Sequence, residues 1–348
     1  MKSQKIKYKT TLPKNKKLLL VMSADKILVI GSEGQIGTVL SHALRDTYGI
    51  ANVITSDINP PRTSVIGHFE KLNILDGERL LAIVKKHKIT QIYHLAALLS
   101  AKGEQNPRQT WDVNMNGLFN VLEVARQENL DKVYFPSSIA VFGGQTPKKA
   151  TPQFTVLQPE TMYGITKEVG EHLAQYYFKK FNLDVRSLRY PGLISYQSLP
   201  GGGTTDYAVD IFHKAVAGEP YECFLERDTY LPMMYMPDAI RATIELMNAP
   251  LEKISMHYGY NVRAMSFSAE ELAAEITKHI PDFKITYKPD FRQQIAESWV
   301  ENMDDTYARN DWGWQEQYDL PAMVEDMIVN LKRIKAQGSS EYDERMFL

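Results

Sequence analysis

Short apolar runs alternate with longer amphipathic stretches through the first half of this chain. Runs of apolar, often β-branched residues predict strands buried on both faces, and apolar positions three or four residues apart predict helices. The predicted strands cover residues 26–30, 53–56, 91–97, 132–136 and 184–190. The predicted helices cover residues 80–87, 111–128 and 162–181, and another begins near residue 39. Because strands that alternate with helices are joined by right-handed crossovers, this pattern predicts a parallel sheet.

The alternation becomes less regular after the strand that ends at Tyr190. A glycine-rich segment, residues 201–206, interrupts it, and short strands and helices follow in mixed order. We therefore expect an α/β fold in which a doubly wound parallel sheet is joined to a smaller C-terminal part.

The first 24 residues differ from the rest, because seven lysines precede the first acidic residue, Asp25. We expect residues 1–24 to form a basic tail without fixed structure, and the protein to be cytoplasmic. The mitochondrial matrix is the alternative, because a segment without acidic residues resembles an organelle transit segment. Such segments are usually rich in arginine, and this one contains none.

Composition narrows the classes of function. Apolar residues make up 44% of the 348 residues and charged residues 24%, which are ordinary values for a globular protein. A formal net charge of −2 argues against nucleic acid as a partner, and no apolar run approaches the thickness of a membrane. Because Cys223 is the only cysteine, we expect neither an internal disulfide nor a Cys/His metal site.

A glycine loop follows the first predicted strand. Gly31, Gly34 and Gly37 are spaced three residues apart and lead into a helical pattern. In a strand, loop and helix unit of this kind, the glycines allow a tight turn, close approach of the backbone to a pyrophosphate and close helix packing. The helix N-terminus directs N–H groups at the phosphates. The loop therefore predicts a Rossmann-type dinucleotide site, and hence a sheet of the Rossmann type.

Asp57 ends the second predicted strand, twenty residues after Gly37. An acidic side chain at this place accepts hydrogen bonds from the hydroxyls of the adenosine ribose and would repel a 2′-phosphate. We therefore expect NAD rather than NADP as the cofactor. The alternative is an ordinary turn residue at a strand end, before Pro60 and Pro61.

Tyr163 and Lys167 lie four residues apart in the predicted helix 162–181, so that their side chains share one face. A neighbouring ammonium favours the ionised phenol, and we expect Lys167 to lower the pKa of Tyr163 toward the range of a general base. Ser138 stands 25 residues before the tyrosine, just after the strand 132–136. Together with the glycine loop, these residues predict hydride chemistry.

Several of these positions directly follow predicted strands. Because the carboxyl ends of parallel strands meet at one edge of a sheet, we expect them to surround a single ligand crevice. They are Gly34, Asp57, Ala96, Ser138 and Pro191.

These motifs resemble those of the extended short-chain dehydrogenase/reductase superfamily, which includes nucleotide-sugar epimerases. From about residue 24 to residue 329, the chain is similar in particular to the threonine dehydrogenases of that superfamily. The segments that carry this likeness are 94–101, 189–192, 200–208, 231–235 and 311–314, of which 201–208 is the most discriminating. The chain departs from the usual glycine loop at Ser32 and Glu33, where small residues are common.

The resemblance implies NAD-dependent oxidation of L-threonine at its 3-hydroxyl to L-2-amino-3-ketobutyrate. Tyr163 would act as general base, Lys167 would support it and hold the nicotinamide ribose, and Ser138 would hydrogen-bond the substrate oxygen. Ser137 is the rival of Ser138 for that role. A nucleotide-sugar 4-epimerase or dehydratase on the same fold and a non-enzymatic NAD sensor are the alternative functions.

The resemblance also implies two sets of binding residues. For the cofactor these are Gly31, Gly34, Gln35, Ile36, Gly37, Asp57, Ile58, Asn73, Ile74, Leu95, Ala96, Ala97, Tyr163, Lys167, Tyr190, Pro191 and Leu193. For the substrate these are Ser100, Ser137, Ser138, Tyr163, Thr204, Thr205 and Trp299. For Trp299 a core position is an equal alternative, because it stands beside Ile295 and Val300.

We expect a cofactor-binding domain over residues 25–195, with a return segment near 235–262. The substrate-binding part would cover residues 196–234 and 263–330, and residues 331–348 would form a polar tail. The product implies a functional link to a 2-amino-3-ketobutyrate CoA ligase.

The two long predicted helices, 111–128 and 162–181, carry more apolar residues than one sheet face needs. The surplus residues are expected to be Leu118, Val121, Leu122, Leu173, Tyr176 and Tyr177. The resemblance implies that these helices pair across a two-fold axis, so that we expect a homodimer.

Overall fold

The computed structural model describes residues 25–61, 67–197, 199 and 203–336. The expected basic tail, residues 1–24, lies outside the described residues, as do residues 337–348 of the expected polar tail.

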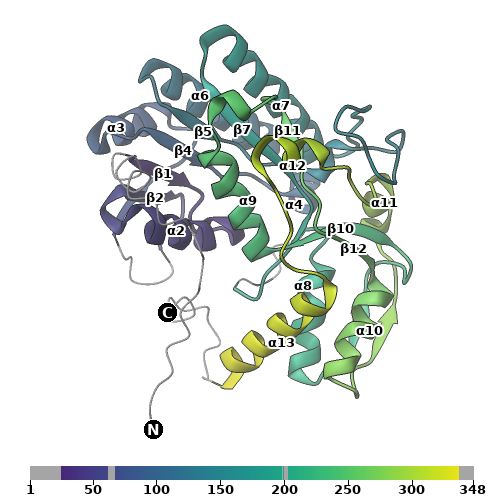
Figure 1. Cartoon of the computed structure of the whole chain (residues 1–348). Helices are drawn as coiled ribbons and strands as arrows, with labels where there is room; N and C mark the ends of the chain where they lie inside the picture. Colours follow the sequence, from purple (N-terminus) through teal and green to yellow (C-terminus); the bar gives the residue numbers. More distant parts are fainter. Residues whose placement is uncertain (1–24, 62–66, 198, 200–202, 337–348) are drawn as a thin grey trace.

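A parallel sheet with helices on both faces forms the larger part of the molecule (Figure 1). Across the described ranges its strands run in the order β11-β7-β5-β4-β1-β2-β3, with β6 beside β7. They are β1 (Ile27–Ile30), β2 (Val53–Asp57), β3 (His68–Lys71), β4 (Gln91–His94), β5 (Lys132–Tyr134), β6 (Ser137–Ser138), β7 (Asp184–Tyr190) and β11 (Gly259–Asn261). Neighbouring strands are parallel throughout this sheet, which confirms the predicted doubly wound α/β fold.

Two hydrophobic cores flank the sheet. The helices that cover it include α2 (Gln35–Tyr48), α3 (Gly77–His87), α6 (Gly117–Gln127), α7 (Met162–Phe181) and α9 (Met236–Asn248). Ile27 and Val29 of β1 pack with α2 and α9, whereas Leu28 and Ile30 pack with α3, α6 and α7. Because successive side chains of a strand point to opposite faces, a strand covered on both sides must be apolar throughout. This is why β1 is an unbroken apolar run.

The predicted helix 162–181 and strand 184–190 are confirmed at the same bounds. The predicted helix 111–128 is instead divided into α5 (Pro107–Trp111), a π-helical turn (Asp112–Asn116) and α6. The edge strand β3 was not expected, because its sequence, His-Phe-Glu-Lys, carries no apolar run.

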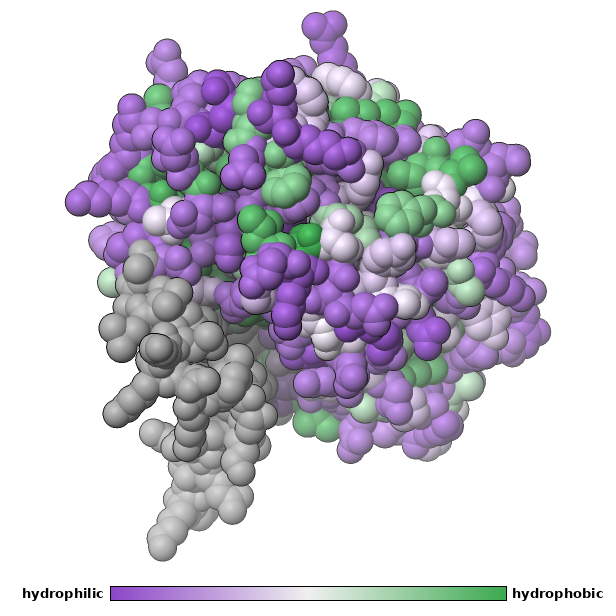
Figure 2. Space-filling view, turned by 45° about the horizontal axis from the view of Figure 1, so that its top comes forward, coloured by the Kyte–Doolittle hydropathy of each residue, from purple (hydrophilic) through white to green (hydrophobic). Residues whose placement is uncertain are grey.

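The outer faces of α6 and α7 differ from the sequence expectation. Leu118, Val121, Leu122 and Tyr177 are buried in the core beneath the sheet, so the prediction that they form a surplus apolar surface is wrong. Leu173 is partly buried against the same core, and Tyr176 is exposed as expected. Phe119 and Phe181 are exposed as well. Figure 2 shows hydrophobic residues in scattered groups among hydrophilic ones on the face turned to the viewer.

The smaller part of the molecule has a core of its own. It contains β8 (Gly192–Ile194), β9 (Tyr221–Cys223), β10 (Tyr230–Tyr235), β12 (Met265–Ser268), β13 (Ile285–Tyr287), α8 (Tyr207–Ala217), α10 (Ala269–His279), α11 (Phe291–Ser298) and α13 (Leu320–Ala336). Strands β12, β10 and β8 form one small sheet, and β13 and β9 form another. Phe212 of α8, Leu272 of α10 and Met323 of α13 meet in the core between them.

Helix α13 continues past the expected end of the folded chain. Met327, Ile328, Leu331 and Ile334 are all buried and follow the helical period. The polar tail predicted to start at residue 331 therefore starts no earlier than residue 337, because an apolar helix face extends beyond the predicted boundary.

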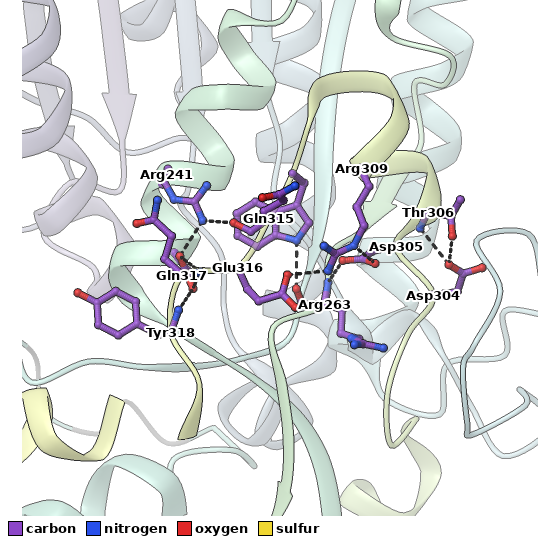
Figure 3. Close-up of polar contacts among 12 residues, drawn as sticks. Arg241, Arg263, Asp304, Asp305, Thr306, Arg309, Gln315, Glu316, Gln317 and Tyr318 are labelled. Carbon is purple, nitrogen blue, oxygen red and sulfur yellow. Dashed lines mark hydrogen bonds and ion pairs between the residues drawn. The ribbon is translucent and has the colours of Figure 1, made fainter. Parts of the chain in front are cut away.

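A C-terminal segment that contains α12 (Thr306–Trp312) ties the two parts together (Figure 3). The indole of Trp314 is buried and donates to the carbonyl of Arg263 at 3.0 Å. The guanidinium of Arg241, on α9, lies 4.7 Å from the centre of the same ring. Arg309 bonds Asp305 at 2.8 Å and Glu316 at 2.6 Å. The contacts of Trp314 hold the C-terminal segment against α9 and the chain after β11, and the bonds of Arg309 lie within the segment.

Candidate active site

Each of the three glycines in the loop after β1 has a different structural role. Gly31 adopts φ +87°, and a Cβ there would lie 2.7 Å from the backbone nitrogen of Ala96. A Cβ at Gly37 would lie 2.1 Å from the carbonyl oxygen of Gly31, so this glycine lets α2 pack against the loop. At Gly34 the nearest atom would be the same oxygen at 3.3 Å, a tight contact but a far less severe one than at Gly31 or Gly37. The bare backbone at Gly34 leaves the start of α2 open to a ligand.

The first turn of α2 suits an anion. Gly34 is its N-cap and offers no side-chain cap, and no acidic residue stands in the first turn, where Gln35 and Ile36 lie. The free N–H groups and the positive end of the helix dipole therefore point to the space beside the loop.

Asp57 lies at the end of β2, directly beside this loop. Its buried carboxylate accepts hydrogen bonds from the backbone nitrogens of Glu33 at 3.1 Å and Asn59 at 2.9 Å. Because a carboxylate has about four lone-pair sites, further hydrogen bonds from a diol can be accepted. The arrangement fits a dinucleotide with its pyrophosphate at α2 and its adenosine ribose at Asp57.

The loop after β4 forms the next wall of this edge. Leu95, Ala96 and Ala97 are partly buried, and the backbone of Leu98 exchanges two hydrogen bonds with the side chain of Asn114, at 2.8 and 3.1 Å. Asn114 belongs to the π-helical turn and also donates to the hydroxyl of Thr166 on α7 at 3.0 Å. The turn thus joins this loop to the helix that carries Tyr163, and π-helical turns are frequent at functional sites.

Tyr163, Lys167 and Ser138 come together at the same edge. The Ser138 hydroxyl lies close enough to the phenol of Tyr163 to lower its pKa, and it accepts a hydrogen bond from the N–H of Ala140 at 3.2 Å. The Lys167 ammonium lies 5.4 Å from the centre of the tyrosine ring and donates to the carbonyl of Pro136 at 2.7 Å. The residues expected to act in hydride chemistry therefore form one cluster, positioned by α7 on one side and by β6, which follows β5 in the chain and pairs with β7, on the other.

The electrostatics of the pair differ from the sequence expectation. Burial raises the pKa of Tyr163 to about 12, and the hydrogen bond from Ser138 opposes this rise. Burial also lowers the pKa of Lys167 to about 7. The expected lowering of the tyrosine pKa by lysine is therefore not dominant, because removal from water disfavours both charges.

Ser137 faces away from Tyr163. Its hydroxyl donates to Oε1 of Glu171 at 2.5 Å in a fully buried setting. Glu171 is in turn bound by Arg189 of β7. Sequence reasoning missed Glu171, although its position four residues after Lys167 on the same helix face could have indicated it.

The remaining candidate cofactor residues differ in burial and in where their side chains lie. Ile58 is exposed, Ile74 is buried, and Asn73 accepts from the nitrogen of Leu75 at 3.1 Å. Pro191 and Leu193 follow β7 at the same edge. The side chain of Tyr190 packs beneath α9, where its hydroxyl contacts Thr243, so only its backbone remains at the edge.

The candidate substrate residues are also divided. Ser100 and Thr204 are buried, and the Thr204 hydroxyl has no hydrogen-bond partner among the residues that the structure describes. A Cβ at Gly192 would lie 2.7 Å from the Thr205 methyl, so Thr205 packs against β8. Trp299 is buried in the core of the smaller part, beside Val300. The ring of Tyr163 packs against this same core.

Two observations concern other site classes. In the described ranges, no group of three or more His, Cys, Asp or Glu residues is arranged to hold a metal ion. Among the described helices, none has the length and apolar character needed to cross a membrane.

Comparison with known proteins places this geometry in context. The NAD dependent epimerase/dehydratase family matches residues 27–262. The mitochondrial L-threonine 3-dehydrogenase of Bos taurus is 48% identical over 307 residues, which are 87% of this chain and 82% of the bovine protein.

Solved structures show the same likeness. The holo form of a GalE-like L-threonine dehydrogenase from Cupriavidus necator is 55% identical, with a TM-score of 0.87, and the match covers 88% of this chain and 100% of that one. A monomeric L-threonine 3-dehydrogenase from a metagenome is 52% identical, with a TM-score of 0.86, over 88% of this chain and 99% of that one.

Proposed function

This chain belongs to the NAD-dependent epimerase/dehydratase family, and we propose that it oxidises L-threonine at its 3-hydroxyl to L-2-amino-3-ketobutyrate. The observation that carries the proposal is the meeting of Ser138, Tyr163 and Lys167 at the sheet edge that also holds the glycine loop. Relatives that are 48% to 55% identical over nearly the whole described chain are L-threonine dehydrogenases, which supports the choice of substrate.

NAD⁺ is the cofactor that we propose. Gly31, Gly34, Gly37 and the first turn of α2 would hold its pyrophosphate, and Asp57 would accept hydrogen bonds from its adenosine ribose. When bound, NAD⁺ would supply the hydride acceptor. A 2′-phosphate would face the Asp57 carboxylate, so NADP⁺ should bind at least tenfold more weakly. Titration of both cofactors tests this, and equal dissociation constants would contradict the role of Asp57.

In this proposal, residues of the chain take up the proton that the oxidation releases. Oxidation of a secondary alcohol breaks its O–H bond, releasing a proton, and the C–H bond on the same carbon, releasing a hydride. Tyr163 accepts the proton on its phenolic oxygen. The hydroxyl of Ser138 and the protonated ammonium of Lys167 both favour the phenolate, and Ser138 can also donate to the substrate oxygen as its charge develops.

The smaller part supplies the amino acid side of the site in this proposal. L-Threonine is a zwitterion, so its carboxylate requires donors and its ammonium requires acceptors. The buried, unpartnered Thr204 hydroxyl, in the described part of the glycine-rich segment, can serve either group. We propose that residues 196–234 and 263–330 form this substrate-binding part.

A nucleotide-sugar epimerase or dehydratase is less well supported. A sugar nucleotide carries a diphosphate, which is usually bound by cationic side chains. Between residues 195 and 235 the lysines and arginines are Lys214 and Arg227. Both are exposed and paired, with Glu219 and Glu270 respectively.

A homodimer through the outer faces of α6 and α7 completes the proposal. Two exposed aromatic side chains stand on these faces, Tyr176, which was expected there, and Phe119, which was not. The metagenomic relative is monomeric, so the assembly of this chain needs a test of its own.

The direct test is reduction of NAD⁺ by the purified protein, followed as NADH absorbance. We expect turnover with L-threonine and none with D-threonine or UDP-glucose. Turnover that requires UDP-glucose, or no reduction with L-threonine at any cofactor concentration, would contradict the proposal.

A further inference from the structure

Helix α7 contacts three consecutive residues of the chain with one of its faces. Tyr163, Lys167 and Glu171 are spaced four residues apart and therefore stand above one another. Tyr163 meets the Ser138 hydroxyl, and Lys167 Nζ donates to the carbonyl of Pro136. Glu171 accepts from the hydroxyl of Ser137. The third contact has no role in the proton transfer described above.

The Glu171 carboxylate is fixed from two directions. Arg189 donates to it through Nε at 2.9 Å and through Nη2 at 2.7 Å, and both side chains are almost fully buried. The bidentate geometry leaves the carboxylate one orientation. Ser137 Oγ, at 2.5 Å from Oε1, then takes a defined place as well.

Arg189 is itself held by the backbone and by β11. Its Nη1 donates to the carbonyl of Gln153 at 3.0 Å and to Oδ1 of Asn261 at 3.1 Å. Gly259, also on β11, leaves room for the carboxylate, because a Cβ there would lie 2.4 Å from Oε1 of Glu171. A polar network that includes a charge pair is thus fully enclosed beneath the cluster.

Strand β6 needs such an anchor. It consists of Ser137 and Ser138 alone, and it pairs with β7 in the register Ser137 to Arg189 and Ser138 to Tyr190. Two residues form few ladder hydrogen bonds, and the Ser138 hydroxyl has one further contact, the N–H of Ala140 at 3.2 Å. A side-chain bond at the adjacent residue restricts the same backbone.

We propose that Glu171 is a positioning residue that, through Ser137, holds the Ser138 hydroxyl against the phenol of Tyr163. This inference rests on the proposed dehydrogenase function and assigns Ser137 a structural bond in place of a substrate contact. A displacement of about 1 Å at a reacting group can lower a rate about 100-fold, so a loosened Ser138 should reduce turnover.

Two variants and a matched control test this. Ser137→Ala removes the hydroxyl and keeps the pair of Glu171 with Arg189. Glu171→Gln removes the carboxylate from the buried arginine. Asp184→Asn is the control, because Asp184 binds the buried Arg186 of the same strand at 2.7 Å, away from the cluster.

We expect kcat with L-threonine to fall about 10- to 100-fold in Ser137→Ala and Glu171→Gln. The dissociation constant for NAD⁺ and the KM for L-threonine should stay within about twofold. Asp184→Asn should lower the melting temperature as Glu171→Gln does and leave kcat unchanged. If kcat is unchanged in both test variants, or if Ser137→Ala raises KM alone, the inference is overturned.

A second readout does not depend on turnover. In protein labelled with ¹³C at Cζ of tyrosine, the Tyr163 resonance can be assigned by its loss in Tyr163→Phe. Because this resonance reports hydrogen bonding to the phenol, it should move in Ser137→Ala and stay in place in Asp184→Asn. If wild-type protein does not oxidise L-threonine, the proposed function fails, and an unmoved resonance in Ser137→Ala then overturns the inference separately.

Discussion

The ammonium of Lys167 donates to the carbonyl of Pro136 at 2.7 Å. Lys167 follows Tyr163 by one helical turn, so this bond ties the helix to the residue just before Ser137 and Ser138. The contact keeps a cation in a buried place, 4.7 Å from the centre of the Phe135 ring. Burial lowers the pKa of Lys167 to about 7. The charged ammonium that favours the Tyr163 phenolate is therefore the form that destabilises the fold.

Replacement of Tyr163 by phenylalanine should separate binding from chemistry. The ring remains, so the dissociation constant for NAD⁺ should change little. Turnover of L-threonine should fall by about two to four orders of magnitude, because that is the usual contribution of a positioned base. Steady-state kinetics and a cofactor titration measure the two effects. Near wild-type turnover would place the base elsewhere.

Lys167→Met should inactivate the enzyme and stabilise the fold. Below a pH of about 7 the folded protein holds a charged, buried lysine, and this penalty is relieved as the pH rises through 7 to the ordinary lysine value of 10.5. At pH 7 the variant should therefore be more stable, by about 2 to 4 kcal/mol after loss of the hydrogen bond to Pro136. Urea unfolding at pH 7 and at pH 10 measures the gain, which should shrink at the higher pH. A less stable variant at pH 7 would contradict this account.

Gly34→Ala should weaken binding of the cofactor far more than it destabilises the fold. The new Cβ would come no closer than 3.3 Å to the protein, and φ at this residue is −79°. It would stand where a pyrophosphate approaches α2, so the dissociation constant for NAD⁺ should rise about tenfold or more. Gly37→Ala is the contrasting change, with a Cβ at 2.1 Å from Gly31, and should destabilise the protein itself. Calorimetric titration and thermal melting distinguish the two, and unchanged NAD⁺ affinity in Gly34→Ala would exclude the loop as the phosphate site.

The free energy of unfolding should depend on pH through Glu70. Burial alone would raise its pKa, but hydrogen bonds from His87 and Lys86, with Arg79 nearby, lower it from 4.5 to about 2. The stabilisation is therefore present above pH 4.5 and is lost as the pH falls toward 2. Glu70→Gln should lower the free energy of unfolding at pH 7 by at most about 3 kcal/mol, and the difference should narrow below pH 4.5. Urea unfolding across this range is the measurement. Glu270→Gln, at an exposed pair, is the control and should change little.

The proposed dimer can be tested at Phe119. Phe119→Glu places a charge on the outer face of α6 and should convert a dimer to a monomer, because a buried, unpaired carboxylate opposes association. Phe154→Glu changes another exposed aromatic residue, outside α6 and α7, and should keep the dimer. Light scattering at micromolar concentration reports both. A monomeric wild-type protein would contradict the assembly.

The elements that the sequence predicted well are those with uninterrupted patterns. Helix α7 and strand β7 agree with their predicted bounds. The helical period of α7 continues to both of its ends, and β7 is buried along its whole length. The π-helical turn could not be predicted, because it depends on bonds from Asn114 to Leu98 and Thr166, which are distant in sequence.

In the candidate site, too, some positions could be predicted from the sequence and others could not. The spacing of Tyr163 and Lys167 places them on one helix face in any sequence context. The direction of a single side chain depends instead on which core is nearest, and this is why Tyr190 turns beneath α9 and Trp299 joins the smaller core. The choice between Ser137 and Ser138 depends on Glu171, whose partner Arg189 is known only once β6 and β7 are paired.

The bond between Arg189 and Asn261 also has a consequence for biosynthesis. The two residues are 72 positions apart, so at about 5 to 20 residues per second Asn261 leaves the ribosome about 4 to 14 seconds after Arg189. During that interval the nascent chain already carries Tyr163, Lys167 and both serines. It lacks the strand that completes the enclosure of the arginine, so the cluster matures only when synthesis has passed β11.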